Sequence, residues 1–164
     1  MFTYGPVKIE RWRPELAGAS AFLRAQHVLL HGNCSTTIGQ FMCEPYMLLP
    51  TTASDAELGD AVLRVLDAAR QAAPPETPAE YLAAERKKLF HTARVRSWKQ
   101  LYATSRHCSI MPGLDQLTIR PTRLERRGAL IPTGHDIVVA QPAEPAQLGR
   151  AVHEAFALST TRAA

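Results

Sequence analysis

The sequence has little that would connect it to a secreted or membrane protein. Its 164 residues include only three cysteines (Cys34, Cys43 and Cys108), too few and too widely spaced for a disulfide framework. No uncharged apolar run reaches about 18 residues, and the first residues lack the basic and then apolar pattern of a secretory signal. Because 46% of the residues are apolar, the chain is not disordered either. We therefore expect one cytoplasmic domain over residues 1–164, with no membrane partner.

The motifs of metal and cofactor sites are also missing. The sequence has no Gly-x-Gly-x-x-Gly, no Walker-type lysine and no His-Glu-x-x-His. A metal site could draw on His27, His31, Cys34 and Cys43, but the cysteines are not spaced as Cys-x-x-Cys and no second ligand pair follows. We therefore expect structural or surface histidines, no metal and no cofactor.

No set of residues in the sequence is typical of catalysis. His107 and Cys108 are adjacent, and on the strand expected there they point to opposite faces, so they cannot act together as base and nucleophile. Cys34 with a distant histidine stays open as a cysteine hydrolase, which would need an unusually reactive thiol. The sequence favours a protein that is not an enzyme.

Apolar periodicity predicts an α/β (α+β) domain, in which a mixed sheet of five or six strands is flanked by helices. Capping boxes, N-terminal prolines and apolar stripes place helices at residues 54–72, 77–90, 97–102 and 145–158. Strands are expected at residues 26–31, 45–49, 108–110, 117–119 and 136–140.

Between these elements the sequence predicts loops. Residues 1–43 form a leading segment, with one short strand at 7–12, and residues 32–39 form a polar loop. Pro121 closes the strand before it, and residues 123–132 form a charged loop.

One internal repeat relates two of the expected helices. Residues 53–62 resemble residues 143–152, and each helix has a glycine, Gly59 or Gly149, in its second turn. A glycine there costs about 1 kcal/mol relative to alanine. We interpret it as a close approach of each helix to its own sheet. An anion site would need glycines in the loop before the helix, and these loops have none.

Positive charge is concentrated in the second half of the chain. Residues 1–83 carry a net charge of −3 and residues 84–164 a net charge of +7, and residues 84–127 hold 11 basic and 3 acidic residues. The aromatic residues Phe90, Trp98 and Tyr102 lie among them, a pattern typical of single-stranded nucleic-acid binding. Trp98 and Leu101 also fit a stripe that faces the core. A nucleic-acid-binding module over 84–127 therefore stays as an alternative function.

Five segments, taken in order, resemble the contact-dependent growth inhibition (CDI) immunity proteins. One contains the motif Ser-Asp-x-Glu-Leu-Gly, and together they are residues 46–63, 98–110, 117–125, 136–139 and 145–152. The resemblance implies a cytoplasmic protein that binds the C-terminal toxin domain of a CDI effector as a 1:1 heterodimer and blocks its active site. Such toxins are often nucleases, commonly acting on transfer RNA.

For contact with the toxin we expect the arginine-rich loop, because a charged loop between two strands has no packing reason to hold four arginines. Its residues are Arg120, Arg123, Glu125, Arg126 and Arg127. The alternative contact is the acidic side of the first helix, with Asp55, Glu57 and Asp60. A local charged patch can direct association even where the net charge of +4 would not.

Overall fold

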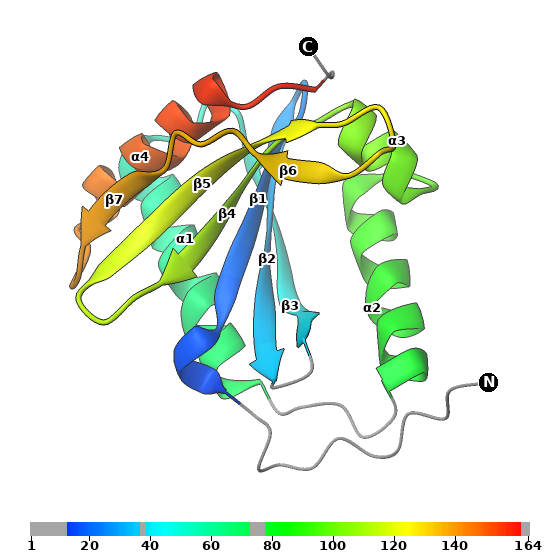
Figure 1. The fold of residues 1–164 in the computed structure, drawn as a ribbon, viewed down its shortest axis with the longest axis horizontal. Coiled ribbons are helices and arrows are strands. Elements are labelled where there is room, and N and C mark those ends of the chain that lie inside the picture. Colours follow the sequence, from blue (N-terminus) through cyan, green and yellow to red (C-terminus); the bar gives the residue numbers. More distant parts are fainter. Residues whose placement is uncertain (1–12, 37–38, 73–77, 162–164) are drawn as a thin grey trace.

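A seven-stranded sheet forms the middle layer of the molecule, with helices on both of its faces (Figure 1). The structure is a computed structural model that describes residues 13–36, 39–72 and 78–161. In chain order the elements are η2 (Pro14–Leu16), β1 (Gly18–Leu23), β2 (His27–Thr36), β3 (Gly39–Pro50), α1 (Asp55–Gln71), α2 (Pro78–Ala93), α3 (Trp98–Ala103), β4 (Arg106–Pro112), β5 (Gln116–Leu124), β6 (Leu130–Pro132), β7 (Ile137–Ala140) and α4 (Pro145–Leu158).

The strands are ordered β3-β2-β1-β4-β5-β6, and β7 pairs with another part of β5. Every ladder between these strands is antiparallel. Within the described residues, no helix is both long enough and apolar enough to cross a membrane.

Alternating side chains of the central strands enter two different hydrophobic clusters, one on each face of the sheet. In β1, Ala21 faces a cluster with α1 and α4, whereas Phe22 faces a cluster with residues of α2 and α3. His107 and Cys108 of β4 are both buried, and Cys108 belongs to the first cluster whereas His107 lies against Phe22. The prediction that these two side chains point to opposite faces is therefore confirmed.

The two repeated glycines lie where α1 crosses α4. A Cβ atom added to Gly59 would lie 1.8 Å from the backbone oxygen of Pro145, and one added to Gly149 would lie 1.8 Å from that of Asp55. The prediction of a close approach is confirmed, but the predicted partner of each helix, the sheet, is wrong. Each helix approaches the first residue of the other helix and not the sheet, because the two N-terminal halves cross directly over one another.

The predicted fold class and helices are confirmed. Ser54 and Glu57 form the capping box at the start of α1, and the Ser97 side chain accepts a hydrogen bond from the Gln100 N–H at the start of α3. Pro145 opens α4, whose buried residues include Leu148 and Phe156.

The details of the sheet differ from the prediction. It has seven strands instead of five or six, and they are antiparallel instead of mixed. The central strand β1 lies inside the leading segment, where small residues such as Ala19 and Ala21 gave no alternation to detect. The strand predicted at 7–12 lies outside the described residues.

Two of the predicted loops are strand instead. Residues 32–36 and 39 onward continue β2 and β3 as a hairpin, in which Asn33 donates a hydrogen bond to Ser20 Oγ at 3.0 Å. Pro121 does not end β5, because it lies between the residues that pair with β7 and those that pair with β6, where a missing N–H is tolerated. The charged loop at 123–132 is correspondingly the end of β5, a tight turn and β6.

Candidate functional site

A groove of about 500 Å³ separates α3 from the turn that joins β5 to β6. Both walls come from the basic part of the sequence. The residues that line it are Trp98, Lys99, Tyr102, Ala103, Leu124, Glu125, Arg126, Arg127 and Gly128. The groove thus combines aromatic rings on the helix with arginines on the turn.

The backbone of the β5–β6 turn fixes the two arginines at its tip. The Glu125 N–H donates to the Ala129 oxygen at 2.8 Å, and the Gly128 N–H donates to the Glu125 oxygen at 2.9 Å. Gly128 has a φ of 86°, the left-handed region that favours glycine. Arg126 and Arg127 are exposed at the tip, and no ion pair to either is found among the described residues.

Aromatic packing anchors the helical wall. Leu101 is fully buried, and the Trp98 ring lies 5.2 Å from Phe90 and 5.6 Å from Tyr102, centre to centre. Tyr102 stacks in turn on Phe22 of the central strand at 6.3 Å. Burial raises the pKa of Tyr102, so its phenol stays neutral. The expectation that Trp98 and Leu101 face the core is confirmed, although Trp98 also lines the groove.

The other arginines of the predicted contact loop lie farther along β5. Arg120 is paired with Asp136, just before β7, through hydrogen bonds of 2.8, 3.0 and 3.2 Å. This bidentate pair joins β5 to the residue before β7 and gives Arg120 a structural role. Arg123 is exposed near the end of β5. The structure therefore brings Arg126 and Arg127 to the groove but leaves Arg120 outside it.

The acidic residues considered as the alternative contact lie on α1, in the opposite helical layer. Asp55 accepts a hydrogen bond from His153 Nδ1 at 2.7 Å and faces Arg150 Nε at 3.6 Å. The Glu57 carboxylate accepts the Ser54 N–H of the capping box at 2.7 Å. Asp60 is exposed. Two of the three acids thus have a partner within the helical layer.

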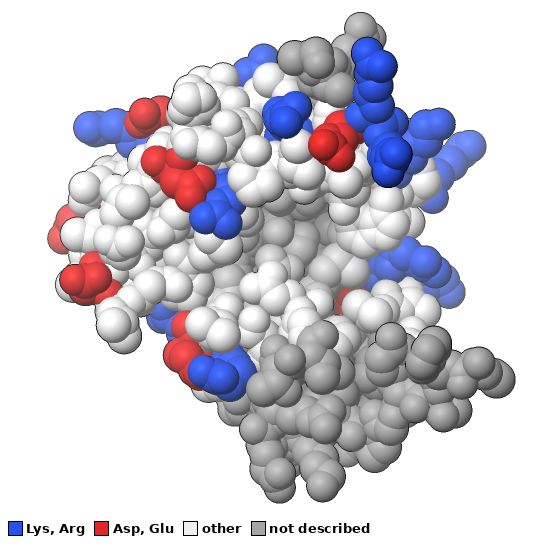
Figure 2. Space-filling view, viewed as in Figure 1, with Lys and Arg blue, Asp and Glu red and all other residues white. Residues whose placement is uncertain are grey.

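Charge is distributed unevenly over the surface. Figure 2 shows Lys and Arg gathered on the side where Figure 1 places α2, α3 and the β5–β6 turn, and several Asp and Glu on the opposite side. The groove between α3 and the turn lies in the basic region, so an acidic surface would be attracted to it.

The structure gives the cysteines and histidines no surface role in the groove. All three cysteines are buried, and burial raises the pKa of Cys108. His31 and His107 are buried as well. In the described ranges, no three His, Cys, Asp or Glu side chains gather closely enough to hold a metal ion.

One feature was not predicted from the sequence. A second cavity, of about 360 Å³, lies at the C-terminal end of α3 and contains Arg24, His27 and Arg94. These residues come from a turn between strands, the start of β2 and the end of α2, and no sequence spacing relates them.

The fold is similar to two solved structures. One is a protein of unknown function, NMB0488, from Neisseria meningitidis, with a TM-score of 0.67 and 14% identity over 97% of this chain and 99% of that one. The other is in a CdiA-CT/CdiI toxin and immunity complex from Yersinia pseudotuberculosis, with a TM-score of 0.68 and 18% identity over 94% of this chain and 99% of that one. No curated protein matches the sequence.

The family model of the CDI immunity protein matches residues 39–159. This match runs from the start of β3 to the end of α4 and includes α3, the β5–β6 turn and the glycine crossing. It covers well over half of the 164 residues, so the chain belongs to the CDI immunity protein family.

Proposed function

We propose that this protein binds the toxin domain of a cognate CDI effector in the cytoplasm, as a 1:1 heterodimer, and blocks the active site of the toxin without catalysing a reaction. Family membership supports a protein partner, and a chain of similar fold is found in a toxin and immunity complex. The toxin is a nuclease in this proposal, with transfer RNA as a candidate substrate.

The observation that carries the choice of surface is the groove between α3 and the β5–β6 turn. Half-buried aromatic rings surrounded by arginine are typical of the residues that dominate binding energy at protein interfaces. Here Trp98 and Tyr102 form the helical wall, and Arg126 and Arg127 stand on the opposite turn. Because the turn is basic, the toxin surface that meets it is acidic in this proposal.

Co-expression tests the proposal. The toxin domain of the cognate CDI effector is expressed with and without this protein. We expect growth only when both are present, and co-purification at 1:1. Growth that does not depend on this protein, with no complex, would contradict the proposed function.

Charge reversal tests the surface. The double variant Arg123→Glu with Arg126→Glu should weaken toxin binding by about tenfold or more. One positive charge at the groove and one beside it on β5 both become negative, so an acidic toxin surface would be repelled. The melting temperature should hardly move, since both side chains are exposed. Asp60→Arg on α1 serves as the control and should bind like wild type. Wild-type binding by the arginine variant, together with weakened binding by Asp60→Arg, would show that the toxin contacts the acidic side of α1 instead.

The combination of aromatic rings and arginines also supports a second candidate function, single-stranded nucleic-acid binding. This function predicts retardation of a short RNA in a gel at low salt, with an affinity that falls steeply as salt rises. An unretarded RNA at low salt would exclude it.

A further inference from the structure

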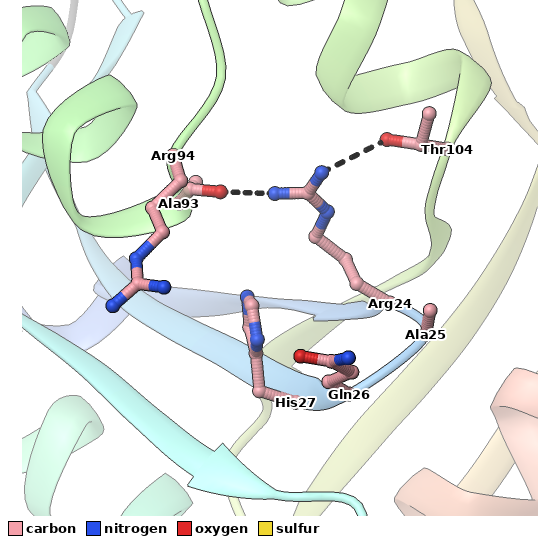
Figure 3. Close-up of a pocket in the computed structure, with 7 residues that line it drawn as sticks. All are labelled: Arg24, Ala25, Gln26, His27, Ala93, Arg94 and Thr104. Carbon is pink, nitrogen blue, oxygen red and sulfur yellow. Dashed lines mark hydrogen bonds between the residues drawn. The ribbon is translucent and has the colours of Figure 1, made fainter.

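The cavity of about 360 Å³ at the end of α3 is another opening in the basic region, apart from the groove. The turn between β1 and β2, the end of α2 and the residue after α3 surround it (Figure 3). None of the described residues that line it is acidic, and two of them are arginines. A cavity with two guanidinium groups and no carboxylate is suited to an anion.

Arg24 is held in a fixed position within this cavity. Its Nη1 donates to the carbonyl oxygen of Ala93 at the end of α2, and its Nη2 donates to Thr104 Oγ1 at 3.3 Å (Figure 3). The ends of two helices thus orient the guanidinium before any ligand arrives. Its Nε–H is not used in either bond.

Arg94 occupies a position that favours glycine. It follows α2 with a φ of 55°. The Val95 N–H donates to the Phe90 oxygen at 3.0 Å and the Arg94 N–H to the His91 oxygen at 3.2 Å, the two bonds of a Schellman motif. An arginine in the left-handed region is strained relative to glycine. The turn itself therefore gives no reason for an arginine. The Arg94 side chain lines the cavity, on the other side of His27 from Arg24 (Figure 3).

His27 supplies an unused polar atom between the two arginines. Its Nε2 is buried and has no hydrogen-bond partner among the described residues. Figure 3 shows the ring standing between Arg94 and Arg24, with a nitrogen directed into the space between them. Burial, followed by the charges of Arg24 and Arg94, lowers the pKa of His27, so the imidazole is neutral in the free protein at pH 7. An anion bound beside it would oppose these effects.

We propose that this cavity binds one carboxylate group, presented by an acidic side chain of the cognate toxin domain. This inference rests on the proposed function and adds a second contact to it. Thr104 at the cavity directly follows Ala103, which lines the groove, so one partner can reach both openings across α3. No aromatic ring other than the imidazole lines the cavity among the described residues, so it offers little surface on which a nucleobase could stack.

Arg94→Gly separates the proposed role from folding. Glycine suits the left-handed position, so the variant should melt at or above the temperature of wild type. The lost guanidinium should weaken toxin binding by about tenfold or more. Arg64→Ala, an exposed arginine on α1, removes the same charge from the other helical layer and should bind like wild type. Wild-type affinity in Arg94→Gly would overturn the proposed role of the cavity and leave the proposed function of the protein standing. Failure of the wild-type protein to bind the toxin domain would instead overturn the proposed function, and with it this occupant.

Titration with acetate, followed by NMR, tests the chemistry without the toxin. In the wild type, acetate should shift the His27 and Arg94 side-chain resonances and raise the pKa of His27. In Arg94→Gly, acetate should change neither the resonances nor the pKa of His27. No shift up to the concentrations at which exposed arginines respond would overturn the carboxylate site. A response to inorganic phosphate and a short RNA, without one to acetate, would overturn it in favour of nucleic acid.

Discussion

The two faces of the sheet bury different kinds of side chains. On the face covered by α1 and α4, the core consists of aliphatic residues with Cys108 and Phe156, and the two helices touch through their glycines. On the face covered by α2 and α3, a smaller aliphatic cluster around Phe22 is bordered by half-buried aromatic rings and accompanied by buried His31, His107 and Glu85. Among the described residues, the buried ionisable group of the first face is the Cys108 thiol, whereas the second face buries two imidazoles and a carboxylate.

This difference separates the part that holds the fold from the part that carries the candidate interface. An apolar core with close backbone contact tolerates few changes in volume. The α2/α3 side adds polar and aromatic contacts to a smaller apolar cluster, and the groove and the second cavity both open on it. Binding surfaces can therefore change there while the α1/α4 side preserves the fold.

The largest effect is expected at the crossing of α1 and α4. Gly59→Ala places a Cβ atom 1.8 Å from the Pro145 oxygen, so the two helix backbones must separate. Helix propensity alone would make alanine more stable by about 1 kcal/mol. We expect instead a loss of about 3 kcal/mol in the free energy of unfolding, measured by urea denaturation.

Gly149→Ala is the matched variant, since its Cβ atom would meet the Asp55 oxygen at the same 1.8 Å. Both losses should be similar, and the double variant should lose less than their sum because the first change already separates the helices. A gain in stability from either single variant would show that the two helices are not in close contact.

An effect of intermediate size is expected from pH on the α2/α3 face. Burial, with a smaller contribution from His31, lowers the pKa of His107 to about 3, and burial also lowers the pKa of His31. The unfolded chain binds protons near pH 6.5, before the folded protein does. Stability is therefore complete above that pH and falls as the pH drops below it, and between pH 6.5 and 5 His107 accounts for a loss of up to about 2 kcal/mol.

Replacing His107 isolates this effect from the titration of carboxylates. The slope of unfolding free energy against pH, measured between pH 6.5 and 5, should be smaller in His107→Gln than in wild type. His91→Gln, an exposed histidine on α2, should keep the wild-type slope. An unchanged slope in His107→Gln would mean that His107 already carries its proton in the folded protein.

The same contrast explains how much of the fold could be predicted from the sequence. The helices of the α1/α4 side could be predicted, because their caps, apolar stripes and repeated glycines are each recognisable within a short segment of sequence. The close approach at Gly59 could be inferred, but its partner could not, since Pro145 is distant in the chain. The central strand β1 was missed because a strand buried on both faces, with small residues, shows no alternation.

The candidate site was less predictable because it depends on tertiary contacts. The arginine-rich loop was identified from its composition, and the structure places Arg126 and Arg127 at the groove while pairing Arg120 with Asp136. The cavity of Arg24, His27 and Arg94 draws on three separate segments. The left-handed backbone of Arg94 and the unpartnered Nε2 of His27 mark it, and neither is visible in the sequence.

The smallest effect is expected where α2 meets β3, at two tyrosines that differ in their acceptors. Tyr46 donates to the buried Glu85 carboxylate at 2.6 Å, and Tyr81 donates to the backbone oxygen of Met42 at 2.6 Å. A hydrogen bond to a charged group contributes about 1.5–3 kcal/mol and one to a neutral group about 1 kcal/mol. Tyr46→Phe should therefore destabilise the protein more than Tyr81→Phe in urea denaturation. Lys88 also donates a hydrogen bond to Glu85, at 2.8 Å. Equal losses in the two variants would show that Lys88 compensates for the lost Tyr46 hydroxyl. The buried polar contacts of α2 would then contribute less to stability than its apolar contacts with the sheet.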